Sequence, residues 1–294
     1  MFNGIATALI TPFDTAGHIA FEKLKELIDW QIEKGVAAIV LSGSTGESAT
    51  LSDDEKKELF KKGVEFTDGR VPLIAGTGTN ATDKVLELSE FASEAGADGF
   101  LVCNPYYNKS NDDGIYAHYK KLSDNVDKPI IVYNIPSRTG KNMELSLELA
   151  LCEIKNVKAF KEASSNLTQI IKFFARKPKD ISVYSGNDEQ TFTFLCLGGN
   201  GTISTCSNIA PEVMCAITDA YFTGDKEEAK QKQFDMLGLF DAMFVDCNPM
   251  PVKTAMNMAG MNVGELRLPL IEIKGEDRAF IREALEKYGI VKRA

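Results

Sequence analysis

Residues that commonly bind metals or form disulfides are scarce in this sequence. Its 294 residues include two histidines and six cysteines, and the cysteines show no CxxC spacing. Neither histidine has a partner at the spacing of metal ligands. The sequence therefore predicts no metal site and no disulfide framework, and scattered cysteines of this kind usually pack as small hydrophobic residues.

A long apolar segment and an excess of basic residues are also missing. No stretch approaches the roughly 20 apolar residues of a membrane helix, and the first residues lack the basic-then-apolar order of a secretory signal. Acidic residues outnumber basic ones by 42 to 33, and the resulting net charge of −9 argues against nucleic-acid binding. We expect a cytoplasmic protein that has neither a membrane nor a nucleic acid as its partner.

Short apolar runs alternate with longer amphipathic segments from residue 5 to residue 223. Eight runs have the length of buried strands: 5–11, 38–42, 71–76, 99–104, 129–135, 157–163, 181–185 and 201–205. The helix-like segments between and after them are 21–34, 53–66, 82–95, 114–123, 145–154, 167–175, 190–197 and 211–223. This alternation indicates an α/β fold with a parallel sheet. Eight units favour a closed (β/α)8 TIM barrel over an open doubly wound sheet.

The pattern changes after Gly224, where only helical segments follow. These segments are 225–244, 249–259 and 276–288. We therefore expect a barrel domain over residues 1–224 and a C-terminal helical appendage over residues 225–294. In such barrels the chemistry takes place at the carboxyl ends of the strands.

Lys161 lies near the end of the sixth expected strand. Because side chains alternate along a strand, Val157, Ala159, Lys161 and Ala163 are expected on one face. Burial among small apolar side chains disfavours the charged lysine and lowers its pKa. A neutral lysine amine is a nucleophile that can form a Schiff base with a ketone. Strand parity alone also allows a lysine that points to solvent.

The end of the fifth strand offers two further polar groups, Tyr133 and Arg138. Each has an ordinary alternative, since a buried tyrosine often only packs and a loop arginine often lies at the surface. The second strand is followed by Gly-Ser-Thr-Gly-Glu at 43–47, which has no Walker lysine. Its backbone amides could instead bind a carboxylate.

Several motifs carry a family resemblance. Residues 43–47, the Tyr-Asn-Ile-Pro-Ser-Arg-Thr-Gly sequence at 133–140 and Lys-Glu-Ala at 161–163 resemble the dihydrodipicolinate synthase/N-acetylneuraminate lyase family, as do residues 105–108, 185–188, 248–253 and 266–269. The matches span nearly the whole chain in the family's order. The resemblance implies a pyruvate-dependent class I aldolase on a (β/α)8 barrel, with a covalent pyruvate imine on Lys161 and no metal or organic cofactor.

The resemblance also implies roles for the other site residues. Tyr133 is expected to shuttle protons, Ser44 to hydrogen-bond to it, and Tyr107 from a neighbouring subunit to link this relay to solvent. Pyruvate is expected to lie against backbone groups near Ser44 and Thr45 and against Gly186 and Ile203. A cross-subunit Tyr107 requires a homo-oligomer, and family members are most often tetramers built as a dimer of dimers.

Arg138 favours the synthase branch of the family. There, the matching arginine binds the carboxylate of L-aspartate 4-semialdehyde, and a planar guanidinium suits a carboxylate. Ser44 departs from this branch, in which threonine is usual, and resembles the lyases. A pyruvate-dependent sugar-acid lyase of the N-acetylneuraminate or 2-keto-3-deoxygluconate type is therefore the alternative enzyme. A non-catalytic binding protein on the same scaffold would require a disabled site, whereas Lys161, Tyr133 and Arg138 are all present.

Feedback inhibition by lysine is a separate question. Family members that respond to lysine bind it near the positions of Ser48, Ala49, Asn80 and Tyr106, helped by an acidic residue at 84 and histidines at 53 and 56. This chain has Lys84, Asp53 and Lys56 at those three positions. The two lysines repel a cationic ligand and Asp53 offsets them in part. We expect weak or absent inhibition by lysine.

Overall fold

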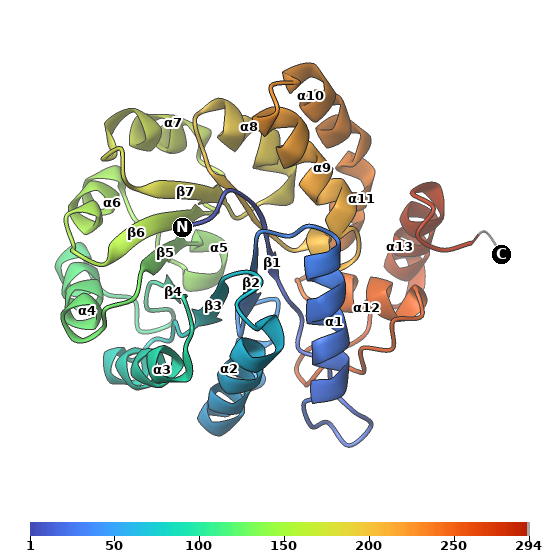
Figure 1. Ribbon diagram of the computed structural model, residues 1–294, viewed down its shortest axis with the longest axis horizontal. Helices are drawn as coiled ribbons and strands as arrows, with labels where there is room; N and C mark the ends of the chain where they lie inside the picture. The colour runs from blue at the N-terminus through green and yellow to red at the C-terminus, as the bar shows by residue number, and fades with distance from the viewer. Residues whose placement is uncertain (293–294) are drawn as a thin grey trace.

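Eight parallel strands close into a barrel in the computed structural model, which describes residues 1–292 (Figure 1). Each strand pairs with its neighbours in the sequence, and β8 closes the ring against β1. The strands are β1 Gly4–Ala8, β2 Ala38–Leu41, β3 Leu73–Gly76, β4 Gly99–Cys103, β5 Ile130–Asn134, β6 Val157–Glu162, β7 Ser182–Ser185 and β8 Gly201–Ser204. The expected (β/α)8 barrel is confirmed.

Helices surround the ring of strands (Figure 1). They are α1 Phe21–Glu33, α2 Asp53–Thr67, α3 Thr82–Ala95, α4 Asp112–Asn125, α6 Leu145–Cys152, α7 Leu167–Arg176, α8 Thr191–Cys196 and α9 Pro211–Phe222. A four-residue helix, α5 Pro136–Thr139, follows β5, and short 3-10 turns occupy η1 Ser48–Thr50, η2 Asp188–Gln190 and η3 Cys206–Asn208. Helix α2 begins at a capping box formed by Ser52 and Glu55.

The interior of the barrel is filled by small, aliphatic and aromatic side chains. Alanines on β1, β2 and β6 share this inner cluster with Tyr184 and Phe2. The rings of Phe2 and Tyr184 stack at 4.3 Å, and the Tyr184 hydroxyl donates a hydrogen bond to the Phe2 carbonyl at 2.7 Å. Because Phe2 precedes β1, this pair closes the amino end of the barrel. The opposite end is left for the loops that follow the strands.

The expected alternation along β6 is wrong at its first residue. Val157 packs in the outer cluster between the sheet and the helices, whereas Ala159 and Ala163 lie in the inner cluster. The register between β5 and β6 shifts between Ile130 and Ile131, which inserts one extra residue into β6. A bulge of this kind reverses which face the preceding residues occupy.

The C-terminal helices extend the outer layer at one side of the barrel, the first of them against α8 and α9 and the last two on the side of α1 (Figure 1). They are α10 Lys226–Asp235, α11 Leu237–Met243, α12 Met250–Met258 and α13 Gly275–Lys287. The single helix expected over 225–244 is wrong, because the chain breaks at Met236 into α10 and α11. The Asp235 carbonyl accepts a hydrogen bond from the Tyr288 hydroxyl, and the Leu239 amide bonds to the Met236 carbonyl instead. The division of the chain at residues 224 and 225 stays a prediction.

None of the helices within residues 1–292 combines the length and the apolar character needed to cross a membrane.

Candidate active site

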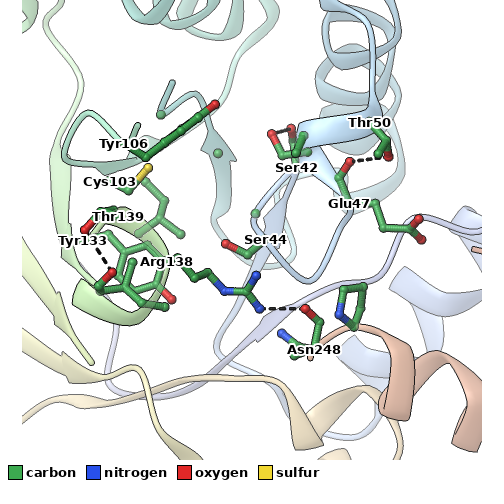
Figure 2. A pocket seen from close by; sticks show the side chains of 18 of the residues that line it. Ser42, Ser44, Glu47, Thr50, Cys103, Tyr106, Tyr133, Arg138, Thr139 and Asn248 are labelled. Carbon is green, nitrogen blue, oxygen red and sulfur yellow. Dashed lines mark hydrogen bonds between the residues drawn. The ribbon is translucent and has the colours of Figure 1, made fainter. Parts of the chain in front are cut away.

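A cavity of about 290 Å³ opens at the carboxyl ends of the strands. Its wall includes residues from the loop after β2, from β4 and β5, and from the loops before α12 and α13. Figure 2 shows Ser44, Tyr133 and Arg138 gathered around this space with Cys103 and Tyr106. Two of these side chains, Cys103 and Tyr106, come from β4 and the loop that follows it.

Lys161 lies against the cavity wall at Tyr133. The Tyr133 and Lys161 Cα atoms are register partners on β5 and β6, and the lysine Nζ lies 4.3 Å from the centroid of the phenol ring. Only 6% of Lys161 is exposed. This burial lowers the pKa of the amine to about 7, with the Asp188 carboxylate opposing and Arg138 reinforcing the shift. A substantial fraction of the amine is therefore neutral at neutral pH.

Gly186, after β7, keeps the space beside Lys161 open. A Cβ atom at this position would lie 3.1 Å from Lys161 Cε and 2.7 Å from Ala163 Cβ. Any larger residue would therefore clash with Ala163 and would make the lysine side chain shift by a few tenths of an ångström. Ile203 on β8 is fully buried in the inner cluster that also contains Tyr133.

Tyr133 is a buried phenol at the base of the cavity. Burial raises its pKa well above the ordinary value, although the Arg138 guanidinium opposes this shift. The phenol is therefore protonated at neutral pH and is able to donate a proton. Ser44 is half-buried and lines the same cavity. Within residues 1–292 no hydrogen bond joins the Ser44 and Tyr133 side chains, so the relay between them stays a prediction.

Asn248 links the two expected substrate-binding side chains and was missed by the sequence reasoning. Its Nδ2 atom donates to the Thr45 hydroxyl at 2.9 Å. Its backbone carbonyl accepts from Arg138 Nη2 at 2.6 Å (Figure 2). Asn248 is buried, and its Oδ1 atom has no hydrogen-bond partner within residues 1–292. The motif at 248–253 contributed to the family resemblance, but the contact between Asn248 and Thr45 spans 203 residues of chain and leaves no local signal in the sequence.

Tyr107 lies outside the cavity of its own chain. Its side chain is 91% exposed, and its backbone takes the left-handed conformation with φ at 66°. The neighbouring Tyr106 instead lines the cavity. A contribution of Tyr107 to this site would have to come from a second copy of the chain.

The cavity has no cluster of metal-binding residues. Within residues 1–292, no group of three or more His, Cys, Asp or Glu side chains is placed to hold a metal ion. His118 is buried on α4, where its Nδ1 atom lies 2.9 Å from the Thr82 hydroxyl, and burial lowers its pKa to about 4. Burial also disfavours the charged form of the Cys103 thiol and raises its pKa to about 11, so the thiol is not a nucleophile at neutral pH.

Comparison with known proteins identifies the family of this barrel. The sequence profile of the Dihydrodipicolinate synthetase family matches residues 1–288. The chain belongs to this family. It is 44% identical over 288 residues to the 4-hydroxy-tetrahydrodipicolinate synthase of Clostridium novyi, covering 98% of this chain and 97% of that protein. The synthase of the same name from Thermoanaerobacter sp. (strain X514) is 45% identical over 296 residues, with 100% and 99% covered.

Solved structures of the dihydrodipicolinate synthetase family share the fold. The chain superposes on dihydrodipicolinate synthase from Thermotoga maritima with a TM-score of 0.96 at 40% identity, covering 99% of this chain and 100% of that one. The synthase from Aquifex aeolicus gives the same TM-score, identity and coverage. The family resemblance expected from residues 43–47, 133–140 and 161–163 is thereby confirmed.

Proposed function

We propose that this chain is a 4-hydroxy-tetrahydrodipicolinate synthase, which condenses pyruvate with L-aspartate 4-semialdehyde in lysine and diaminopimelate biosynthesis. The family membership and the full-length relatives that carry this name support the proposal. The observation that carries it in this chain is the buried Lys161 amine, whose pKa is lowered to about 7 by burial, beside the Tyr133 phenol. An amine of this kind is a nucleophile for a keto acid.

The first half of the reaction would form an enamine on Lys161. The neutral amine attacks the pyruvate ketone, and the ketone oxygen leaves as water after taking up two protons, one from the amine and one from an acid, which gives a protonated imine. Loss of a proton from the pyruvate methyl group then gives the enamine. The protein's own lysine stores the electron pair, so the step requires neither a metal nor an organic cofactor. The amides near Ser44 and Thr45 would hold the pyruvate carboxylate, with Gly186 and Ile203 beside it.

The second half would join the two substrates. The enamine carbon attacks the aldehyde carbon, and the aldehyde oxygen takes up a proton to become a hydroxyl group. The amino group of the semialdehyde then attacks the imine carbon and releases the Lys161 amine, which closes the ring. Arg138 would bind the carboxylate of the semialdehyde. Its place on the cavity wall, where Asn248 holds one of its N–H groups, supports this assignment.

Proton transfer would pass through Tyr133, with Ser44 next to it and Tyr107 from a second subunit completing the route to solvent. The high pKa of the buried Tyr133 phenol supports a proton donor. The 91% exposure of Tyr107 supports a partner subunit over its own chain as the place where it acts. We therefore propose a homo-oligomer, a tetramer built as a dimer of dimers, located in the cytoplasm.

A sugar-acid lyase that uses the same imine is not favoured by the relatives, which carry the synthase name. Ser44 is the residue in its favour and Arg138 opposes it. Initial rates with pyruvate and aspartate semialdehyde, measured beside a panel of keto sugar acids, separate the two activities. Condensation with the semialdehyde and no cleavage of the sugar acids is the expected result. Cleavage of a sugar acid without condensation would overturn the proposal.

A further inference from the structure

A buried ion pair joins the C-terminal helices to the loop after β2. Lys253 on α12 donates from Nζ to Glu47 Oε1 at 2.7 Å, and the two side chains are 1% and 0% exposed. Figure 2 shows the Glu47 carboxylate directed away from Ser44 and the other labelled cavity residues. The pair therefore belongs to the support of the cavity and not to the group of side chains that would touch substrate.

All three N–H groups of the Lys253 ammonium have acceptors. Besides Glu47, Nζ donates to the Thr11 carbonyl at 2.9 Å and to the Glu265 carbonyl at 2.9 Å. The Phe13 ring centroid lies 4.1 Å from the same atom. One lysine thus fixes the loop after β1, the loop after β2 and the segment before α13 to α12. Burial lowers the pKa of Lys253, and Glu47 counters this shift.

Glu47 holds the end of the loop that carries Ser44 and Thr45. Its backbone adopts the left-handed conformation at φ 56°, and its amide donates to the Ser44 carbonyl at 3.2 Å. Its second carboxylate oxygen accepts the Arg267 amide at 2.9 Å. A non-glycine residue in the left-handed conformation costs free energy and persists where its surroundings hold it. Here both carboxylate oxygens of Glu47 are engaged.

The buried Lys253–Glu47 ion pair is not expected to add much to the stability of the fold. Burying two charges carries a desolvation cost that a well-packed apolar pair of similar size avoids, so a buried ion pair is weak evidence of net stabilisation. It does fix geometry, because each charged group accepts only a few directions of approach. The same segment of chain also bonds to this loop a second time, through Asn248 and the Thr45 hydroxyl.

We propose that Lys253 and Glu47 are positioning residues for the pyruvate site. They hold the loop at 43–47 so that Ser44 and Thr45 present their backbone groups to the carboxylate of the keto acid, and they make this subsite dependent on α12. This inference rests on the proposed function. Arg138, the proposed carboxylate site for the aldehyde, lies on α5; its contact with this segment is the Asn248 carbonyl before α12, so it depends less directly on the ion pair than the loop at 43–47 does.

The double variant Glu47→Gln/Lys253→Met tests the proposal, because it removes both charges together and leaves neither one buried alone. The KM for pyruvate is expected to rise about ten- to a hundredfold, the range that losing hydrogen bonds to charged groups produces. The KM for aspartate semialdehyde is expected to change less than about twofold. Borohydride trapping at saturating pyruvate should still modify Lys161 in the full amount of folded protein.

The matched control is Glu272→Gln/Arg278→Met, which removes an exposed ion pair from the same C-terminal region. This variant should keep both KM values. Glu47→Gln alone repeats the comparison with a side chain of the same shape if the double variant does not fold. A pyruvate KM unchanged in the Glu47 variants, with kcat and the trapped fraction reduced in proportion, would overturn the proposal, because it shows only a loss of folded enzyme.

Hydrogen exchange separates this inference from the proposed function. The amides at 43–48 are expected to exchange faster in the Glu47 variants than in the wild type and the control. Unchanged exchange in this loop would overturn the inference even if the variants were less active. Wild-type protein that traps no pyruvate would overturn the proposed function instead, and the exchange result would still report whether the ion pair holds the loop.

Discussion

The amine of Lys161 and the ring of Tyr133 face each other inside the barrel, with Nζ 4.3 Å from the ring centroid. The contact follows from the pairing of β5 with β6, which makes the two residues register partners. It brings a nucleophile and a proton donor together through the pairing of two strands. Two rigid strands therefore fix the central geometry of the proposed reaction.

The adduct on Lys161 is expected to depend on pH through the lysine itself. Its pKa is lowered by burial to about 7, and the neutral amine is the reactive form. The neutral fraction is therefore about a tenth at pH 6 and about nine tenths at pH 8. The rate of borohydride trapping with pyruvate should rise across this interval and level off above it. A rate that still climbs tenfold per pH unit beyond pH 9 would show an ordinary, solvated lysine.

Lys161→Ala is expected to abolish the pyruvate adduct while the barrel stays folded. Mass spectrometry of peptides after borohydride treatment should find the modification at Lys161 in the wild type and at no residue in the variant. Lys158→Ala, at a neighbouring lysine of the same strand, is the control and should keep the adduct. A persistent adduct in Lys161→Ala would place the nucleophile elsewhere.

Tyr133→Phe is expected to lower kcat by about 10²–10⁴-fold, the usual contribution of a general acid–base group. Phenylalanine keeps the ring that packs against Lys161 and removes the hydroxyl alone. The circular dichroism spectrum should therefore match that of the wild type. Tyr184→Phe removes a buried hydroxyl from the neighbouring strand β7, where it bonds to the Phe2 carbonyl, and this control should leave kcat within a small factor. An unchanged kcat in Tyr133→Phe would remove the residue from the proton route.

Much of the barrel could be predicted from the sequence because its elements are local. Each apolar run of strand length became a strand within a few residues, and the helix expected over 53–66 begins at Asp53 as α2. The bulge in β6 and the break at Met236 could not be predicted in this way. The first is set by pairing with β5, and the second accompanies a hydrogen bond from Tyr288, 53 residues away from its acceptor Asp235.

The site residues show the same difference between features that are local in the sequence and contacts between distant segments. Lys161, Tyr133 and Gly186 lie at strand ends, where the topology of the barrel predicts chemistry. Asn248 and Lys253 lie on a segment after the barrel, and their partners Thr45 and Glu47 are more than 200 residues earlier in the chain. Contacts at this separation depend on how the C-terminal helices pack, so the motif could be recognised but its role could not.

Gly186→Ala is expected to damage the site with little effect on the rest of the fold. The new methyl group would meet Ala163 Cβ at 2.7 Å and Lys161 Cε at 3.1 Å, so the chain at Ala163 must shift and the lysine side chain must yield by a few tenths of an ångström. Overpacking of this kind typically costs about 1–3 kcal/mol of stability. Trapping with pyruvate should slow by tenfold or more. Gly238→Ala, in helix α11, is the control and should trap pyruvate at the wild-type rate.

Arg138→Ala is expected to raise the KM for aspartate semialdehyde by about ten- to a hundredfold, because a guanidinium–carboxylate contact is lost. The pyruvate adduct should still form, since the imine does not require Arg138. Arg138→Lys should recover only part of the affinity, because an ammonium cannot bind a carboxylate through two parallel N–H groups. An unchanged KM for the semialdehyde would show that its carboxylate binds elsewhere. It would also remove the main argument against a sugar-acid lyase activity.

L-Lysine is expected to inhibit this enzyme weakly or not at all. Lys84 Nζ lies 2.7 Å from Asp53 Oδ2 and 3.3 Å from Glu87 Oε2, so the carboxylate at position 53 is already paired. Lys56 is buried on the same helix as Asp53, and its burial lowers its pKa. A cationic ligand would therefore meet the chain's own amines in place of a free carboxylate.

The inhibition is measured by initial rates at subsaturating pyruvate, with L-lysine raised to several millimolar. Lys84→Glu should increase the sensitivity to L-lysine if charge decides the response. Inhibition of the wild type below 1 mM would show that the amines at 56 and 84 do not exclude the ligand.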